Sequence, residues 1–345
     1  MRFVSPLLKK IIYPALHSSG WLGQSVRGGC AVVNYHGVMP GDYTRDGGFL
    51  DGNLVSEGEL RKQLRFLKSH YDVITPQDFR LWIEKGEILP SRAVLITCDD
   101  GLLNSLTDMV PVLQSENLVC LFFVTGASCS DRPGMLWYEE LYHLLRAAET
   151  MGQEVQLPIG PECRSMPSAT FQSRWWGAVR GASCLGSGAR AEWMEQLRGK
   201  CGVDDVWRSE RRWRLLNHRE LHALAQTGME VGAHTMTHPV LSDCSVAEAA
   251  REIAESKGQL ERALGRTIWA FAYPFGNPST MGEREVALAR EAGYTCAFLN
   301  VGGGGVDRAT PFALFRTHVS ADMEVAELEA HLTGFHTRLQ RAVRA

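Results

Sequence analysis

Short runs of apolar and β-branched residues recur along this chain of 345 residues, and most are followed by a helix-like stretch. Such alternation is typical of repeated strand–helix units, whose strands pair in parallel within one sheet. The chain is long enough for one large barrel with insertions. We therefore predict an α/β fold, a distorted (β/α) barrel, with strands at Ala31–Tyr35, Asp72–Thr75, Ala93–Thr97, Val119–Thr125, Glu230–Ala233, Trp269–Ala272, Thr295–Leu299 and Leu314–Val319.

Two of the intervening segments carry clear helix signals. Ser56–His70 begins with a serine that can cap the helix and places its leucines on one face. Ser245–Leu264 repeats this pattern, and Gly265 stands where a helix is expected to end.

The strand–helix rhythm is interrupted around Pro158–Arg190, which is rich in Pro, Gly and Ser. We predict a helical insertion at about residues 135–225 of a barrel domain that spans residues 30–320. Residues 1–29 form an N-terminal segment, and residues 321–345 a C-terminal helix. Tryptophans of the insertion could stack on sugar rings, although ordinary packing is the favoured interpretation; they are Trp137, Trp175, Trp176, Trp193, Trp207 and Trp213.

The charges limit the possible classes of binding partner, and the cysteines indicate the cellular compartment. The formal net charge is −3 with acids and bases interspersed, so nucleic acid is not expected as a partner. The nine cysteines form no CxxC pair, which indicates buried thiols in a reducing compartment. The segment Met1–Pro14 is too short and too polar to span a bilayer. We favour a helix docked on the barrel, with contact to a membrane surface as the alternative, and hence a cytoplasmic protein or one at the inner membrane face.

Three motifs follow predicted strands, at the edge where barrel enzymes carry their catalytic groups. Thr97–Gly101 contains Asp99 and Asp100, adjacent carboxylates that repel each other unless a cation or proton separates their roles. His234–His238 places imidazoles at i and i+4, where both can face one metal ion. Phe271–Pro278 is a strand that runs into a turn with Pro and Gly, and such a turn can aim a backbone N–H at an oxyanion.

Each motif alone is weak, because an Asp-Asp pair is often a solvated turn and an HxxxH pattern is often packing. In this order and spacing they indicate a metal site. Two neutral imidazoles and one carboxylate form a triad that leaves coordination positions open for water and substrate.

The motifs resemble those of the polysaccharide deacetylases, carbohydrate esterases that include chitooligosaccharide, peptidoglycan and biofilm poly-N-acetylglucosamine deacetylases. The family pattern is T-[FY]-D-D-G, then H-[ST]-x-x-H, then a strand end with proline. The resemblance covers roughly Ala31–Val319 apart from the insertion. It implies an irregular barrel of about seven strands, a (β/α)7 barrel with a helical insertion.

The resemblance also implies a role for each motif. Asp99 corresponds to the catalytic base, and Phe275 stands where a backbone N–H helps to bind the oxyanion. The metal ligands correspond to Asp100, His234 and His238. We expect a divalent metal, Zn²⁺ first, with Co²⁺, Ni²⁺ or Mn²⁺ as alternatives.

The sequence departs from the family pattern at two positions. Cys98 replaces an aromatic residue and is expected to pack rather than to bind metal. Tyr273 replaces an arginine that orients the base, as in the branch of biofilm and exopolysaccharide deacetylases, and we expect it in the oxyanion and substrate region. Arg316 is a candidate for the missing cation beside Asp99, with a structural salt bridge as the alternative.

Two histidines are candidates for the general acid. His36 ends the first predicted strand and matches the same branch of the family, whereas His318 lies in the last predicted strand. A lone buried histidine is more often structural than catalytic, but the position at the barrel edge favours His36.

The motifs and the resemblance predict a hydrolase of C–N bonds other than peptide bonds. It would be a metal-dependent deacetylase that removes an N-acetyl group from an amino sugar in a glycan or glycan precursor, as in exopolysaccharide biosynthesis. The alternatives are a metal-dependent amidase with a non-sugar substrate and a non-catalytic glycan-binding protein on the same scaffold. Either would be expected to lose part of the motif set, which is complete here.

Overall fold

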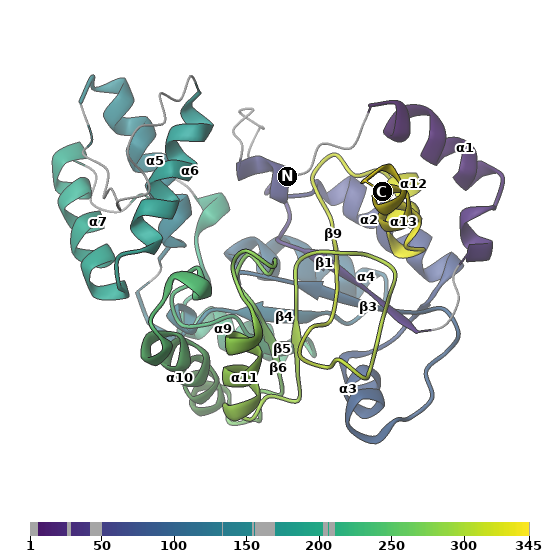
Figure 1. The fold of residues 1–345 in the computed structure, drawn as a ribbon. Helices are drawn as coiled ribbons and strands as arrows, with labels where there is room; N and C mark the ends of the chain where they lie inside the picture. The colour runs from purple at the N-terminus through teal and green to yellow at the C-terminus, as the bar shows by residue number, and fades with distance from the viewer. Residues whose placement is uncertain are drawn as a thin grey trace.

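The sheet is mostly parallel and curls into an incomplete barrel (Figure 1). The computed structural model describes residues 6–25, 29–41, 50–132, 134–153, 155, 170–202, 206 and 211–344. Its strands are β1 (Cys30–Tyr35), β2 (Asp72–Val73), β3 (Ala93–Cys98), β4 (Leu121–Val124), β5 (Glu230–Ala233), β6 (Ala270–Ala272), β7 (Cys296–Phe298), β8 (Gly305–Val306) and β9 (Thr317–His318).

The strands are ordered β7-β6-β5-β4-β3-β1, and β9 continues this parallel run beyond β1. A parallel bridge between Phe298 and Leu314 returns the chain to β7, so the sheet nearly closes on itself. The short strand β2 pairs with the start of β3, and β8 runs antiparallel to the start of β1. The predicted irregular (β/α)7 barrel is thereby confirmed, and β8 is an addition that the sequence did not indicate.

The helices begin and end where local signals place them. The Ser56 and Ser245 side chains accept hydrogen bonds from the Glu59 and Glu248 N–H groups, both at 3.2 Å, and cap α2 and α10. Gly265 ends α10 in the left-handed conformation, with φ 64°. The α-helices are α1 (Tyr13–Ser18), α2 (Glu57–His70), α3 (Pro76–Lys85), α4 (Val110–Ser115), α5 (Trp137–Thr150), α6 (Phe171–Ser183), α7 (Ser187–Cys201), α9 (His218–Gln226), α10 (Val246–Leu264), α11 (Glu283–Glu291), α12 (Val325–Leu332) and α13 (Phe335–Arg344).

The insertion forms a lobe of its own beside the barrel (Figure 1). Helices α5, α6 and α7 share one hydrophobic cluster, which includes Trp137, Trp175 and Trp213. These three side chains are buried, as the packing interpretation predicts, whereas Trp207 lies outside the described residues. Helix α9 falls within the predicted range of the insertion but packs against α10 of the barrel.

The two ends of the chain pack against each other. Helix α1 contacts α12, so the N-terminal segment docks on the fold as expected. The C-terminal region is two helices rather than the single helix predicted, because Gly334, with φ 68°, breaks the chain between α12 and α13. Among the described residues, no helix combines the length and the apolar character that crossing a bilayer requires.

Candidate active site

The predicted catalytic and ligand residues meet at one edge of the barrel. Asp99 and Asp100 follow β3, and His234 follows β5 directly. His36 follows β1, and Arg316 precedes β9. Because these strands are parallel, their carboxyl ends share one edge of the sheet, and residues far apart in sequence become neighbours.

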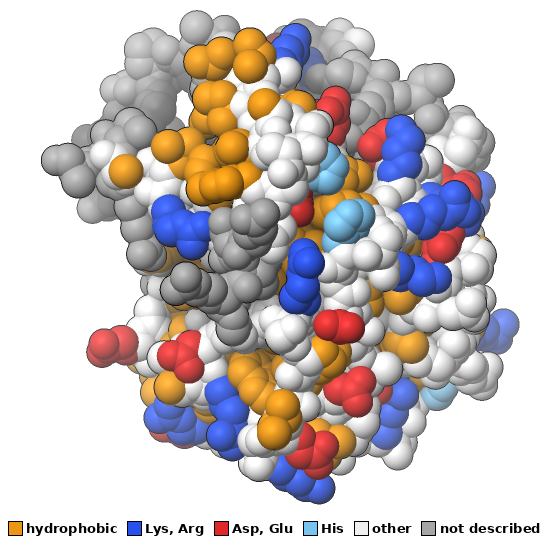
Figure 2. All heavy atoms as spheres, turned by 90° about the vertical axis from the view of Figure 1, so that its right-hand side faces the viewer, with side chains coloured by type: hydrophobic (Ala, Val, Ile, Leu, Met, Phe, Trp, Pro, Cys, Tyr) orange, Lys and Arg blue, Asp and Glu red, His pale blue; other side chains and the backbone are white. Residues whose placement is uncertain are grey.

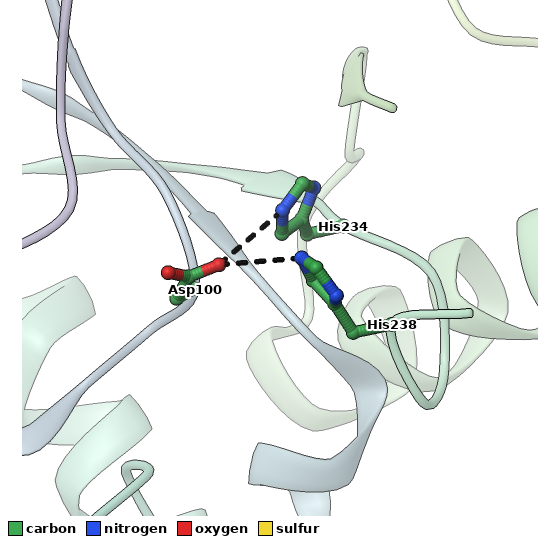
Figure 3. A group of neighbouring side chains, drawn as sticks. All are labelled: Asp100, His234 and His238. Atoms are coloured by element: carbon green, nitrogen blue, oxygen red, sulfur yellow. Dashed lines mark ion pairs between the residues drawn. The ribbon is translucent and has the colours of Figure 1, made fainter. Parts of the chain in front are cut away.

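Asp100, His234 and His238 form a buried cluster that fits a metal ion (Figure 3). The Nε2 atoms of both histidines lie 3.5 Å from Asp100 Oδ1, and the three candidate ligand atoms lie within 4.8 Å of one another. Ligands at about 2.1 Å from a tetrahedral Zn²⁺ are roughly 3.4 Å apart. The spacing from the carboxylate to each imidazole therefore matches what a shared ion requires.

The hydrogen bonds of the cluster prepare it for a cation. His234 Nδ1 lies 2.7 Å from the carbonyl oxygen of Ala272, so Nδ1 carries the proton and Nε2 presents its lone pair to the cluster. Burial, and then the nearby His234, lower the pKa of His238 to about 3, which keeps this imidazole neutral as a ligand must be. Burial opposes the ionisation of Asp100, but the surrounding histidines outweigh it and lower its pKa.

The backbone at the site is strained. Five non-glycine residues of the described chain have a left-handed φ, and four of them are at this site: Asp100 (77°), Thr235 (64°), His238 (56°) and Phe275 (58°). Such conformations cost roughly 1–2 kcal/mol each and persist when surrounding structure enforces them. Gly101 also has a positive φ, and a Cβ there would lie 2.8 Å from Val124 Cγ1. The turn that presents Asp100 therefore requires glycine at position 101.

Asp99 is held by a buried arginine. The Arg316 Nη1 and Nη2 groups donate to the two carboxylate oxygens of Asp99 at 2.7 and 2.6 Å, and Asn34 Nδ2 donates to Oδ2 at 2.9 Å. Burial is the largest single effect on Asp99 and opposes its ionisation, but the charge and hydrogen bonds of Arg316, together with His234 and His36, outweigh it and hold the pKa of Asp99 well below the usual range. The predicted contact is present, and Asp99 is ionised and oriented beside the metal cluster.

The two candidate general acids are neighbours. The rings of His36 and His318 lie 4.8 Å apart in an edge-to-face arrangement. His36 Nε2 lies 3.3 Å from Asn300 Nδ2, which is also linked to Asn34 through a hydrogen bond of 3.0 Å between Asn34 Nδ2 and Asn300 Oδ1. Burial lowers the pKa of both histidines. Both histidines are therefore placed where the general acid is expected.

Phe275 and Tyr273 take different positions. The Phe275 ring packs 4.9 Å from that of His238, and its backbone N–H has no hydrogen-bond partner within the described chain, as an oxyanion donor requires. Tyr273 is not brought to the site. It is fully buried, and its hydroxyl donates to the Phe312 carbonyl at 3.1 Å. Side chains alternate along β6, so Tyr273 follows Phe271 into the helix layer, and the expectation that it binds substrate is wrong.

Cys98 and two residues of the insertion complete the surroundings. Cys98 packs in the hydrophobic cluster between sheet and helices, as expected. Tyr138 places its ring 5.1 Å from that of His238, and Trp137 Nε1 donates to the His238 carbonyl at 2.9 Å. Sequence reasoning had missed these contacts and Asn34. A signal existed only for Asn34, a polar residue in an otherwise apolar strand.

Comparison with known proteins supports the family that the motifs indicate. Residues 205–297 match the family model of polysaccharide deacetylases, a range that includes the His234–His238 and Phe271–Pro278 motifs. YxkH of Bacillus subtilis (strain 168), named as a candidate polysaccharide deacetylase, is 17% identical over 316 residues, which are 91% of this chain and 80% of YxkH. The chain is therefore similar to polysaccharide deacetylases, a family of hydrolases of non-peptide C–N bonds, over the matched range and, more distantly, over most of its length.

Solved structures share the fold. The Streptococcus pyogenes deacetylase PplD, solved with acetate, is 16% identical with a TM-score of 0.56, and the match covers 89% of this chain and 99% of PplD. IcaB from Ammonifex degensii is 18% identical with a TM-score of 0.55, covering 89% of this chain and 97% of IcaB. The barrel described here is thus the architecture of known deacetylase structures.

Proposed function

We propose that this protein is a metal-dependent deacetylase that removes the N-acetyl group from an amino sugar of a glycan or glycan precursor. The observation that carries the proposal is the buried Asp100–His234–His238 cluster beside an ionised Asp99. A glycan-binding protein that had lost catalysis would not need both the strained turn that presents Asp100 and the buried ion pair of Asp99. The family match supports a glycan as the substrate class.

Asp100, His234 and His238 would hold the metal, and Zn²⁺ is the simplest choice for two imidazoles and one carboxylate. When bound, such an ion lowers the pKa of water and polarises a carbonyl group. His234 is fixed for this task by its bond to the Ala272 carbonyl.

The remaining residues act on protons and charge. Asp99, ionised and fixed by Arg316, accepts a proton from the water whose oxygen attacks the acetamide carbon. The Phe275 N–H donates to the oxyanion that forms on the carbonyl oxygen. His36 or His318 donates a proton to the nitrogen as the C–N bond breaks, so that a neutral amine leaves. The products are acetate and the free amino sugar.

The decisive experiment measures acetate release from N-acetylglucosamine oligomers, with metal-replete and chelated protein side by side. We expect release that a chelator abolishes, that Zn²⁺ or Co²⁺ restores and that Asp99→Asn lacks. Absence of release from protein that binds metal stoichiometrically would exclude this substrate class and favour a different acylated substrate. Absence of both would favour a glycan-binding protein.

The general acid is identified by comparing His36→Ala with His318→Ala. The variant that lacks the acid loses the alkaline limb of the pH profile of kcat/KM, since no group then protonates the leaving nitrogen. The variant that keeps this limb identifies the other histidine as the acid. Unchanged limbs in both would contradict the assignment to this pair.

We also propose that the protein works at the cytoplasmic face of a membrane, which it contacts through its N-terminal helix. Leu7 and Ile11 are 55% and 59% exposed, and Trp21 is 46% exposed. Figure 2 shows the side of the molecule that carries α1, with hydrophobic side chains gathered along its upper edge. Buried cysteines such as Cys30, Cys98 and Cys120 carry free thiols, in keeping with a reducing compartment.

Sedimentation with anionic lipid vesicles tests this contact. Ile11→Asp should weaken binding several-fold, because a charge replaces a residue that enters the interface. Ile88→Asp is the matched control, since Ile88 is 97% exposed and follows α3 on a different part of the surface. Equal binding by both variants would refute membrane contact through the exposed residues Leu7 and Ile11.

A further inference from the structure

A cavity of about 240 Å³ lies between the insertion and the barrel edge. Its barrel side is formed by Thr125 and Ala127 after β4 and by Thr237, the neighbour of His238, and its other side by α5 and α7. Trp137 is part of its wall and donates to the His238 carbonyl. The cavity thus adjoins the candidate metal centre.

Arg190, from α7, brings a positive charge to this cavity. Its side chain stacks over the Trp137 ring, with Cζ 4.8 Å from the centroid, and the residue is 3% exposed. Nη2 donates to Thr237 Oγ1 at 3.3 Å, whereas Nη1 is buried without a hydrogen-bond partner in the described chain. A buried cationic donor without a partner is costly, and proteins keep one where a ligand or ordered water completes it.

The acidic groups around Arg190 are engaged elsewhere. Glu252 accepts hydrogen bonds from the backbone of the metal loop at 2.8 Å, and Glu248 accepts the Ser187 N–H at 2.6 Å. Glu140, in the cavity wall, forms a bidentate salt bridge with Arg198, with N···O distances of 2.6 and 2.8 Å. Among the described residues, no carboxylate lies within ion-pair distance of the Arg190 guanidinium. The residues that line the cavity thus carry two cations, Arg190 and Arg198, and one carboxylate, Glu140, which is paired with Arg198; Glu248 and Glu252 act on Arg190 from outside the lining.

The rest of the wall suits a sugar ring. The Thr125 hydroxyl is fully buried and has no hydrogen-bond partner among described residues, so its hydrogen-bonding capacity at this wall is unused. Met135, Leu136 and Met194 supply apolar surface of the kind that packs on the C–H face of a pyranose. The volume is somewhat below the roughly 300–1,000 Å³ of sites for drug-sized ligands and suits one monosaccharide unit.

We propose that this cavity is a subsite for a carboxylate, carried by an acidic sugar residue that neighbours the N-acetylated residue at the metal centre. A planar guanidinium with free N–H groups is the side chain that best recognises a carboxylate. The inference rests on the proposed deacetylase function for its location in the substrate path. Acetate, the released product, offers the same carboxylate chemistry without the ring, and the experiment separates the two sources.

The test is isothermal titration of chelated full-length protein with glucuronate, glucose and acetate. We expect glucuronate to bind at least 10-fold more tightly than glucose, because one charge-assisted contact to a buried cation contributes about 10- to 100-fold. Arg190→Met should remove that difference, and Arg190→Lys should restore part of it. Arg174→Met, which removes an exposed arginine of the same lobe, is the control and should bind like the wild type.

Each outcome has a defined meaning. Acetate binding that is as tight as glucuronate binding and equally dependent on Arg190 assigns the carboxylate to the product, whereas tighter glucuronate binding assigns it to an acidic sugar. Equal binding of glucuronate and glucose, or discrimination that survives in a folded Arg190→Met protein, overturns the subsite. Circular dichroism and thermal melting of each variant identify loss of folding. If Arg190→Met does not fold, Thr125→Val tests the subsite instead, and it is expected to weaken glucuronate binding several-fold. Because chelated protein does not turn over, failure here leaves the acetate-release test of the deacetylase function untouched.

Discussion

Replacing Arg316 by methionine leaves the Asp99 carboxylate buried without the cation that holds it. The pair has two short hydrogen bonds, and the arginine and aspartate are 0% and 2% exposed. Removing one partner of such a buried pair costs about 3–5 kcal/mol, because the remaining charge is uncompensated. The Arg316 side chain also donates to the Leu299 carbonyl and to Asn34, so the loss is expected toward the upper end of that range.

The same change alters the chemistry of Asp99. Burial by itself raises the pKa of this carboxyl, and the charge of Arg316 is the largest effect that opposes it. In Arg316→Met the pKa of Asp99 therefore rises, and the ionised base appears only at higher pH. In the wild type, protonation of Asp99 lies below the pH range of the assay; in Arg316→Met it should enter that range, so that the acidic limb of kcat/KM is found at higher pH.

Two assays check this reasoning together. Denaturant unfolding of the wild type, Arg316→Met, Asp99→Asn and the double variant gives the coupling energy, and the double variant should be less destabilised than the sum of the single changes. A pH profile of acetate release gives the shift of the acidic limb. Additive destabilisation together with an unmoved acidic limb would refute the view that Arg316 acts through the charge of Asp99.

Three further predictions follow from the site and the termini. His234→Ala and His238→Ala should each lose stoichiometric metal by elemental analysis, and retention of a full equivalent would contradict the ligand set. Gly101→Ala should lower the free energy of unfolding by roughly 1–3 kcal/mol and reduce activity, because its Cβ meets Val124 and its φ is positive; an unchanged melting temperature would argue against this. Burial, and then His336, lower the pKa of His331 to about 3. The folded state thus favours neutral His331, and stability should fall by up to about 1.4 kcal/mol per pH unit as pH decreases from about 6.5, a slope that His331→Leu should reduce in pH-dependent unfolding.

The approach of Asp100, His234 and His238 to one another was predictable because its signals are local. Asp99, Asp100 and His234 follow strands that the apolar runs delimit, and parallel strands bring such ends together whatever lies between them. The caps of α2 and α10 were visible for the same reason, since a capping serine acts within its own turn. The positions of the residues at the centre of the site could therefore be predicted from the order of the parallel strands, without other tertiary contacts.

The surroundings of the cluster depend on contacts that sequence does not display. Tyr273 was misplaced because alternation along β6 decides which layer it enters, and the position in the motif does not reveal that. The contacts of Trp137 and Arg190 exist because the insertion folds back on the metal loop. Strand β8 is only two residues long and begins at the last glycine of the run Gly302–Gly305, so no apolar pattern predicts it.

The left-handed residues of the site lower the stability of the fold in order to position the candidate ligands. Asp100, Thr235, His238 and Phe275 together cost on the order of 4–8 kcal/mol, which is comparable with the whole net stability of an ordinary domain. The remainder of the barrel must therefore contribute enough free energy of folding to offset this strain, which is concentrated at the residues that position the candidate ligands. Selection for higher melting temperature alone would be expected to relax these four positions first and to yield a sturdier protein with a poorer metal site.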